Sequence, residues 1–218
     1  MTDITCEHCC GADKLFDEKS ARKQKKRYLK KGPRKTTRKL IGLITESMNG
    51  ASSLLEIGGG IGAVQMELMN AGLKRVTSVD ASSGYIKVAR ELSSSKGYSD
   101  QVHYLEGDFM NHERSIDTHD VVVMDKVICC YPHFEALLST SMSKSTSILA
   151  VVYPKSNFGG RILVRMGNLY FRFKGNPFRS FMHDNQIIRS RIKEGGFELK
   201  GAKTVYPWNV EVYRRPTS

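Results

Sequence analysis

A glycine-rich turn at the end of an apolar run most constrains what this chain can fold into. The run extends from Leu54 to Ile57, and glycines follow at positions 58, 59, 60 and 62. Glycine has no Cβ and takes positive φ easily, so the backbone here can turn sharply and pass close to a ligand. The residues after the turn are helix-compatible, and the first N–H groups of a helix lack intrahelical partners. A strand, glycine-rich turn and helix in this order are typical of a nucleotide-binding α/β sheet; the alternative is a tight turn without a ligand.

The glycine spacing alone leaves the kind of nucleotide open. Gly58, Gly60 and Ala63 satisfy the dinucleotide fingerprint G-x-G-x-x-G/A, which is a weak signal by itself. Two carboxylates near the loop favour a nucleotide other than a dinucleotide. Glu56 lies two residues before the first glycine, and Asp80 closes the next strand-like run, where it can accept hydrogen bonds from both hydroxyls of a ribose.

A Gly-Asp-Phe segment at 107–109 follows a third strand-like run. Together with the carboxylate and glycines of 56–62 and with Asp80, it resembles the class I S-adenosylmethionine-dependent methyltransferases. The resemblance covers residues 50–153 well and the rest of the chain loosely. It implies an enzyme, a transferase, whose cofactor is S-adenosyl-L-methionine.

The resemblance also implies a role for the residues of these motifs. Glu56 would orient the methionine end of the cofactor, directly or through water, against the bare backbone of the glycines. Asp80 would take the ribose hydroxyls, and Asp108 would accept from the adenine amino group beside the Phe109 backbone. For Asp108 the alternative is a turn-forming aspartate. The implied cofactor-binding residues are Glu56, Gly58, Gly60, Asp80, Ala81, Asp108, Phe109 and Asp125.

Strand and helix patterns alternate after this loop. Strands are expected at 52–57, 75–80, 101–106, 120–124 and 146–153, and helices at 62–72, 83–95 and 133–143. The run at 120–124 is rich in β-branched valine, which suits a parallel strand buried on both faces. This alternation predicts right-handed crossovers in a doubly wound sheet.

The C-terminal pattern completes the expected fold. Asp184 can cap a helix that runs to about Lys193, and strands are expected at 197–206 and 208–215. In the resembled family this strand pair forms a hairpin whose last strand inserts antiparallel. We therefore expect an α/β, Rossmann-like, doubly wound fold. Its seven-stranded sheet is mostly parallel with an antiparallel last strand, and it carries N-terminal helices and an insert after strand five.

Residues 1–49 precede the first strand and are expected to be helical and basic. A helix fits 17–31, a Gly-Pro pair ends it, and Thr36 or Thr37 can cap the next helix. The resemblance implies that this segment lies over the pocket as a lid, and the alternative is a helix pair packed on the sheet edge. The expected domains are thus a basic helical lid at 1–49 and a methyltransferase domain at 50–218.

An aromatic and basic insert at 155–182 follows the fifth strand. Small-molecule members of the resembled family commonly build the acceptor pocket from the N-terminal segment and from this region. Both are basic here, which favours a small acidic or aromatic acceptor, methylated on oxygen or nitrogen. The expected acceptor-binding residues are Tyr28, Tyr153, Arg161 and Arg165, with residues 30–35 of the lid. The chain is also loosely similar to the methyltransferase that esterifies a magnesium porphyrin propionate.

The segment at 125–132 follows the fourth strand, and ligands in open α/β sheets gather at the carboxyl ends of strands. It should therefore line the methyl-transfer centre. A phenol, alcohol or protonated amine would need a base within hydrogen-bond reach, whereas a carboxylate would need only cationic partners. His133, Tyr131 and His183 are the candidate catalytic residues by position, and for each histidine a surface or structural role is the alternative.

A net charge of +12 leaves other partners open. The cations concentrate at 19–39 and 161–191, and they can serve RNA, an anionic membrane, a small anion or simply a solvated helix face. One alternative to a small-molecule enzyme is therefore an RNA or protein methyltransferase. Another is a membrane-associated methyltransferase of a lipid or quinone-like acceptor, which would use the apolar residues of 162–173. A non-catalytic cofactor-binding module is a further alternative, and the oligomeric state is not indicated.

The composition favours a soluble protein in a reducing compartment. Hydrophobic residues make up 40% of the chain, and no apolar run approaches the length of a membrane span. The start lacks a secretory signal, and five cysteines form no regular framework, so a cytoplasmic location is expected. Cys6, His8, Cys9 and Cys10 have half the spacing of a zinc knuckle, but no second ligand pair lies nearby. No metal is therefore expected.

Overall fold

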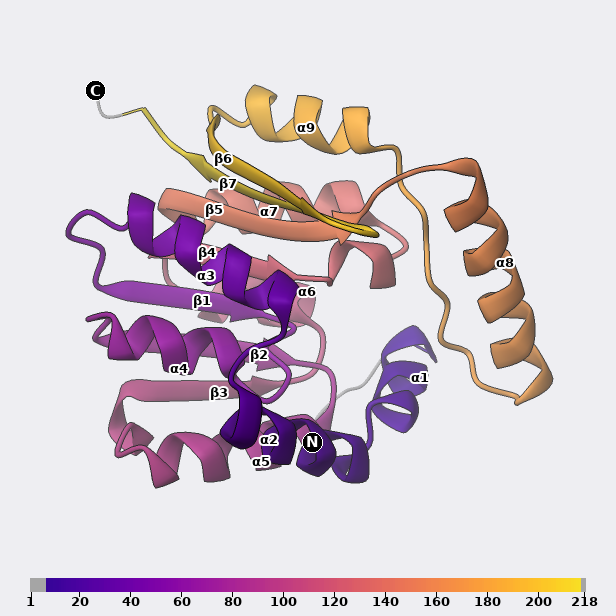
Figure 1. Ribbon diagram of the computed structural model, residues 1–218, viewed down its shortest axis with the longest axis horizontal. Helices are drawn as coiled ribbons and strands as arrows, with labels where there is room; N and C mark the ends of the chain where they lie inside the picture. Colours follow the sequence, from indigo (N-terminus) through magenta and orange to yellow (C-terminus); the bar gives the residue numbers. More distant parts are fainter. Residues whose placement is uncertain (1–6, 217–218) are drawn as a thin grey trace.

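A seven-stranded sheet forms the centre of the molecule (Figure 1). This computed structural model describes the backbone of residues 7–216 and the side chains of residues 11–216. The strands are β1 (Ser53–Ile57), β2 (Arg75–Asp80), β3 (Val102–Glu106), β4 (His119–Asp125), β5 (Ser145–Pro154), β6 (Glu198–Val205) and β7 (Trp208–Arg214). Their order is β3-β2-β1-β4-β5-β7-β6. The first five pair in parallel, and β7 runs antiparallel to both β5 and β6. The expected Rossmann-like fold is confirmed.

Helices cover both faces of this sheet (Figure 1). They are α1 (Glu7–Leu15), α2 (Glu18–Lys31), α3 (Lys35–Ser47), α4 (Ala63–Asn70), α5 (Ser83–Ser95), α6 (Phe109–His112), α7 (Phe134–Ser143), α8 (Phe158–Phe173) and α9 (Asn185–Glu194). Short 3₁₀ turns lie at η1 (Ser99–Gln101), η2 (Glu113–Ser115) and η3 (Ile128–Cys130). Successive strand residues point to opposite faces, so Leu54 joins the core under α3, α4 and α5, while Leu55 joins the core under α7 and α9.

The carboxyl ends of the parallel strands face the side of the molecule where α1 and α8 lie (Figure 1). Strand β1 is buried along its whole length between β2 and β4. Its residues therefore cannot move without disturbing both neighbours, and the loop that follows it starts from a fixed point. This arrangement places the glycine-rich turn at one end of a rigid sheet.

The helix after the Gly-Pro pair begins differently from the expectation. Arg34 is its N-cap and provides no side-chain hydrogen bond, so neither Thr36 nor Thr37 caps α3. The Thr37 hydroxyl instead donates to the Asp125 carboxylate at the end of β4, over 2.7 Å. A tertiary partner has replaced the local one that a capping pattern would predict.

The insert after β5 contains the long helix α8, capped by the Asn157 side chain. None of the residues of α8 is buried. The chain then returns along the body to Asp184, which caps α9 through the Gln186 N–H at 2.7 Å, as the sequence predicts. The insert thus carries a helix that protrudes from the sheet (Figure 1).

The N-terminal helices divide between two locations. α2 packs on α5, and α3 packs against β5, β6 and β7. The cysteine and histidine residues weighed as half of a zinc knuckle lie outside the described side chains. Within residues 7–216, the helices are all too short or too polar to cross a membrane.

Candidate active site

A cavity of about 930 Å³ lies at the carboxyl ends of the parallel strands. Its walls come from the glycine loop, the ends of β1, β2 and β4, the segment from α1 to α3, and the return segment after α8. Small-molecule sites commonly measure roughly 300–1,000 Å³, so this cavity is near the upper end of that range. The cavity therefore brings together segments that are far apart in the sequence.

The glycine loop forms one wall of this cavity, and its geometry requires glycine. Gly58 and Gly60 have φ of +65° and +57°, which side-chain-bearing residues rarely adopt. A Cβ on Gly58 would also lie 2.5 Å from a methyl of Val127. The Gly58 N–H donates to the Val79 carbonyl at 2.7 Å, which fixes the start of the turn against β2. Bare backbone therefore faces the cavity.

Asp80 holds the same loop from the neighbouring strand. One carboxylate oxygen accepts from the Gly60 N–H at 2.7 Å, and the other accepts from the Ser82 N–H at 2.8 Å. Burial raises the pKa of the Asp80 carboxyl, although these two amide donors act in the opposite direction. Asp80 thus organises the turn as well as lining the cavity. Sequence reasoning missed the first of these roles, because the resemblance implies only a ribose partner.

Glu56 lies at the bottom of the cavity with its carboxylate almost fully buried, at 2% exposure. Among the described residues, its Oε2 atom has no hydrogen-bond partner. Burial, and then the negative charges of Asp125 and Asp80, hold the pKa of this carboxyl well above its ordinary value. A buried acceptor without a donor costs free energy, so this side chain is suited to a cationic, hydrogen-bonding ligand group.

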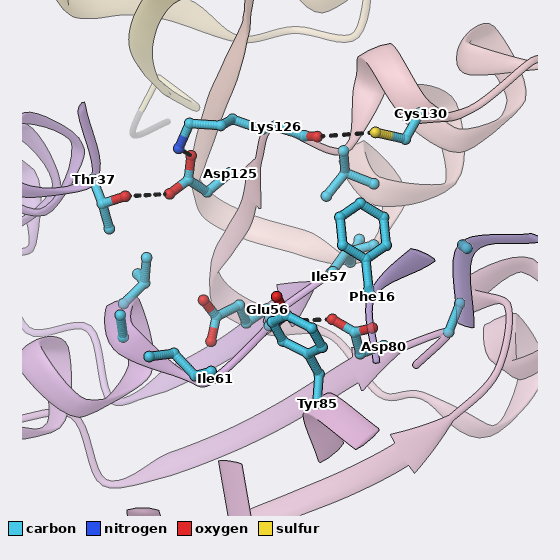
Figure 2. A pocket seen from close by; sticks show the side chains of 18 of the residues that line it. Phe16, Thr37, Glu56, Ile57, Ile61, Asp80, Tyr85, Asp125, Lys126 and Cys130 are labelled. Atoms are coloured by element: carbon cyan, nitrogen blue, oxygen red, sulfur yellow. Dashed lines mark hydrogen bonds and ion pairs between the residues drawn. The ribbon is translucent and has the colours of Figure 1, made fainter. Parts of the chain in front are cut away.

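Asp125 ends β4 and is linked to the N-terminal segment. It accepts from the Thr37 hydroxyl at 2.7 Å and pairs with the Lys126 ammonium at 2.6 Å (Figure 2). Lys126 has φ of +70°, an uncommon conformation for a residue with a side chain, and its ammonium lies 5.6 Å from the Trp208 ring centroid. Strained backbone of this kind is often found at functional sites. In Figure 2, Glu56 lies between the Thr37–Asp125 pair and Asp80.

Asp108 and Tyr131 form another part of the cavity wall. The Asp108 carboxylate accepts from the Met110 N–H at 3.0 Å and caps the short helix α6. The Tyr131 hydroxyl donates to both oxygens of this carboxylate at 3.0 Å. Tyr131, expected as a catalytic residue, is therefore bonded to the carboxylate expected at the adenine. The neighbouring Phe109 side chain is buried in the core.

Neither candidate histidine is among the residues that line the cavity. His133 is exposed at the start of α7. His183 packs between the rings of Phe134 and Phe181, and its Nε2 lies 3.1 Å from the carbonyls of Ile128 and Tyr131. Burial lowers the pKa of the His183 imidazole. His183 therefore connects the return segment to the turn after β4, which is a structural role.

The expected acceptor-binding residues divide in the same way. Tyr28 lines the cavity, and its hydroxyl donates to Glu67 at 2.7 Å. Tyr153 is fully buried in the core, where its hydroxyl donates to Glu211 at 2.5 Å, and it is not among the residues that line the cavity. Arg161 and Arg165 are exposed on α8 and do not line the cavity, because the helix turns them away from it. The basic side of the insert is thus not a pocket wall.

The cavity also has aromatic and cationic lining residues, and some of them lie outside the segments that the sequence predicted. Phe16 makes edge contacts with Tyr85 and Phe178, at centroid distances of 6.0 and 5.7 Å. The cationic lining residues within the described structure are Arg27, Arg34, Lys35 and Lys126. Lys35 and Arg34 belong to the lid segment 30–35 and Lys126 to the segment 125–132, both expected from the sequence, whereas Arg27 lies outside the expected lining. Phe16 and Trp208 also line the cavity, but neither belongs to a sequence motif that would have predicted this.

The residues present fit the cofactor that the motifs imply. The glycine backbone allows close approach, and the Glu56 Oε2 atom, which has no partner among the described residues, offers a site for the amino group of a methionine moiety. The carboxylates of Asp80 and Asp108 line the same cavity, as acceptors for ribose and adenine require. The geometry therefore suits a bound, positively charged nucleoside derivative.

Comparisons with known proteins agree with this site. Residues 54–143 match a family model described as "Methyltransferase domain". A sequence search among curated proteins finds no match. The fold is similar to magnesium protoporphyrin IX methyltransferase (ChlM) from Synechocystis PCC 6803, solved with bound SAH. The TM-score is 0.65 and the identity 19%, over 83% of this chain and 82% of that one.

Two other solved structures show the range of reactions that this fold supports. An O-methyltransferase family 2 protein from Planctomyces limnophilus DSM 3776, in complex with apigenin, has a TM-score of 0.62 and 16% identity. It covers 91% of this chain and 62% of that one. The [4+2]-cyclase SpnF has a TM-score of 0.61 and 13% identity, over 83% and 82% of the two chains. Likeness at these identities shows the fold alone.

The match to the methyltransferase family model supports an enzyme class as well as a fold. It spans β1 to α7 and so contains the carboxylate and glycine motifs from which the resemblance was inferred. The resemblance to the class I methyltransferases is confirmed, and with it the enzyme class and the cofactor, S-adenosylmethionine. The acceptor is not fixed by these matches.

Proposed function

We propose that this protein transfers a methyl group from S-adenosylmethionine to a small acceptor that carries an acidic group and an aromatic or apolar body. The observation that carries this proposal is the mixed lining of one cavity. Buried carboxylates and bare glycine backbone lie in the same space as Arg27, Arg34, Lys35 and several aromatic rings. The carboxylates suit a cationic cofactor, and the cations suit an anionic acceptor.

On the cofactor side, Glu56 would hold the amino group of the methionine moiety, which would give its Oε2 atom a hydrogen-bond donor. Asp80 would bind the ribose hydroxyls, with Ala81 and Gly60 close by in the same wall, and Asp108 would accept from the adenine amino group. When bound, the cofactor supplies a methyl group on a sulfonium, which is an activated leaving group. The protein must then align an acceptor atom with that methyl and exclude water.

On the acceptor side, the absence of histidine from the described cavity lining bears on the acceptor atom. A neutral alcohol or a protonated amine would require a base, whereas a carboxylate is already ionised at neutral pH. The cluster of Arg27, Arg34 and Lys35 would bind a carboxylate and would also lower the pKa of a phenol. We therefore infer that the methyl acceptor is an oxygen that these cations keep ionised, a carboxylate before a phenolate.

We further propose that the N-terminal helices act as a lid. The residues from Ala12 to Thr37 contribute about a third of the cavity wall, and Thr37 is bonded to the end of β4. Release of this contact would open the cavity between α3 and the sheet. A lid of this kind excludes water during transfer and lets the product leave.

The proposal is tested by methyl transfer from radiolabelled S-adenosylmethionine to a panel of aromatic carboxylic acids and phenols. The matched amides and methyl ethers serve as controls, because they keep the ring and remove the ionisable oxygen. We expect label in the acids or phenols and none in the controls. Label that enters total RNA or protein, and no small acid, would overturn the proposal.

A further inference from the structure

Helix α8 exposes an apolar stripe that no other described part of the chain covers. Phe158, Ile162, Met166, Leu169 and Phe173 follow one another at spacings of four, four, three and four residues, so they fall on one side of the helix. Leu163 and Tyr170 widen the same side. These seven side chains are 45–86% exposed, and Phe173 is the most exposed at 86%. Such a row of large apolar side chains in contact with water is costly unless something covers it.

The opposite side of α8 faces its own protein. Gly160 lies so close to the return segment that an added Cβ would be 2.9 Å from the Met182 methyl. The Asn168 side chain exchanges two hydrogen bonds with the backbone of Ser180, both of 2.8 Å, and the rings of Phe171 and Phe178 meet at 5.5 Å. These contacts fix which side of the helix points outward.

A row of arginines borders the apolar stripe. Arg161, Arg165 and Arg172 follow at spacings of four and seven residues, one helix position away from the stripe, and all three are exposed. None of them forms an ion pair with the residues that the structure describes. The sequence from 155 to 183 also contains no aspartate or glutamate. The surface is therefore apolar and cationic, without a compensating acid.

We propose that α8 is a docking helix that lies in the surface of an anionic lipid membrane. An apolar stripe beside a row of basic residues is the pattern of helices that insert shallowly at the headgroup level. At 16 residues the helix is about 24 Å long, which is enough to lie in the interface and too short to span the bilayer. The arginines would bind lipid phosphates while the apolar side chains enter the acyl boundary.

Charge complementarity distinguishes this occupant from a second copy of the chain. Two copies joined stripe to stripe would bring their arginine rows together with no acid on either helix to neutralise them. Nucleic acid would be expected on a face rich in cations, whereas the outermost side chains here are apolar. An anionic membrane satisfies both the apolar and the cationic part of the surface.

The location of α8 gives this docking a consequence for the cavity. Phe171 near the end of α8, and Phe178 and Ser180 in the return segment, line the cavity wall. A membrane bound to the outer side of α8 would therefore lie close to the cavity. An acceptor with an apolar body could then enter from the lipid phase. The docking itself does not depend on the identity of the acceptor.

The test is vesicle flotation of the full chain with phosphatidylcholine vesicles and with mixed phosphatidylcholine–phosphatidylglycerol vesicles. We expect at least about ten-fold stronger binding to the mixed vesicles, and a similar loss in the double variant Met166→Asp/Phe173→Asp. The matched control is Leu29→Asp/Leu199→Asp, which adds the same two charges at exposed apolar positions on α2 and β6. The control should stay within about two-fold of the wild type.

A second measurement keeps the proposal falsifiable if the double variant misfolds. Phe173→Trp places a fluorophore on the stripe, and its emission should shift to the blue with the mixed vesicles. Wild-type protein that stays unbound by mixed vesicles would overturn the proposal. So would an equal loss in both double variants, because general charge would then explain binding. Concentration-dependent dimerisation that Met166→Asp/Phe173→Asp abolishes, without vesicle binding, would assign the stripe to a second copy instead.

Discussion

At the scale of single residues, the site is defined by a carboxylate whose burial works against folding and for binding. Glu56 is buried, one of its oxygens has no donor, and its pKa is raised. A carboxyl with a raised pKa binds protons more readily in the folded state than in the unfolded state. It therefore lowers stability as pH rises from the ordinary value of 4.5 towards its folded value.

The variant Glu56→Gln separates the effect of Glu56 on folding stability from its effect on cofactor binding. The variant removes the buried charge, so the thermal stability of the ligand-free protein at neutral pH should rise or stay unchanged. The wild-type protein loses stability as pH rises above 4.5, and this loss should be smaller in the variant. Affinity for S-adenosylhomocysteine should fall by about 1–3 kcal/mol, because the amino group loses its charged partner. Thermal scans and calorimetry at several pH values measure both. A variant that loses stability and keeps its affinity would contradict the role of Glu56.

Asp80 should behave differently, since it already holds two backbone amides. Asp80→Ala should weaken cofactor binding by about 1–3 kcal/mol and also lower stability, as the Gly60 and Ser82 amides lose their acceptor. Limited proteolysis at the glycine loop reports the second effect. Unchanged affinity in this variant would reject the assignment of Asp80 to the ribose.

At the scale of elements, the connection between α3 and β4 is the contact that closes the proposed lid. Thr36 and Thr37 are both buried, at 7% and 6% exposure, but within residues 11–216 only the Thr37 hydroxyl forms a side-chain hydrogen bond, to Asp125. The two threonines therefore provide a matched pair, in which one substitution removes the contact and the other removes only a hydroxyl.

We expect Thr37→Val to weaken cofactor binding by about 1 kcal/mol, because the variant loses the hydrogen bond to Asp125 that keeps the proposed lid closed over the cofactor. Thr36→Val should leave binding nearly unchanged. Calorimetry, with hydrogen exchange of α3 as a second readout, distinguishes them. Equal effects of the two substitutions would indicate that packing, and not the bond to Asp125, controls the lid.

At the scale of the whole molecule, the sequence predicted the sheet because local and global signals agree there. The bounds of β2 and α5 match the expected 75–80 and 83–95, and Glu56 and Asp80 line one cavity as their motifs implied. Where only tertiary geometry decides, the positions of side chains could not be predicted from the sequence. The rotation of α8 turns Arg161 outward, and packing in the core buries Tyr153. The residues around Arg161 and Tyr153 in the sequence do not indicate either position.

The histidines illustrate the same limit. His133 and His183 flank the expected transfer centre in sequence, but one is exposed and the other packs between two aromatic rings. Phe16 enters the cavity from a segment far from it in sequence. A sequence motif predicts the positions of residues that lie within the motif, such as Glu56. The walls around the acceptor come from segments that are far apart in the sequence, so no single motif predicts them.

The most direct test of this account is a calorimetric titration of the wild-type chain with S-adenosylhomocysteine and, in parallel, with NAD. The account predicts one site for S-adenosylhomocysteine, with a dissociation constant of micromolar order, about −8 kcal/mol, and no binding of NAD. The glycine loop alone would permit either ligand, but the buried Glu56 fits only the first. Binding of NAD without any response to S-adenosylhomocysteine would contradict the account.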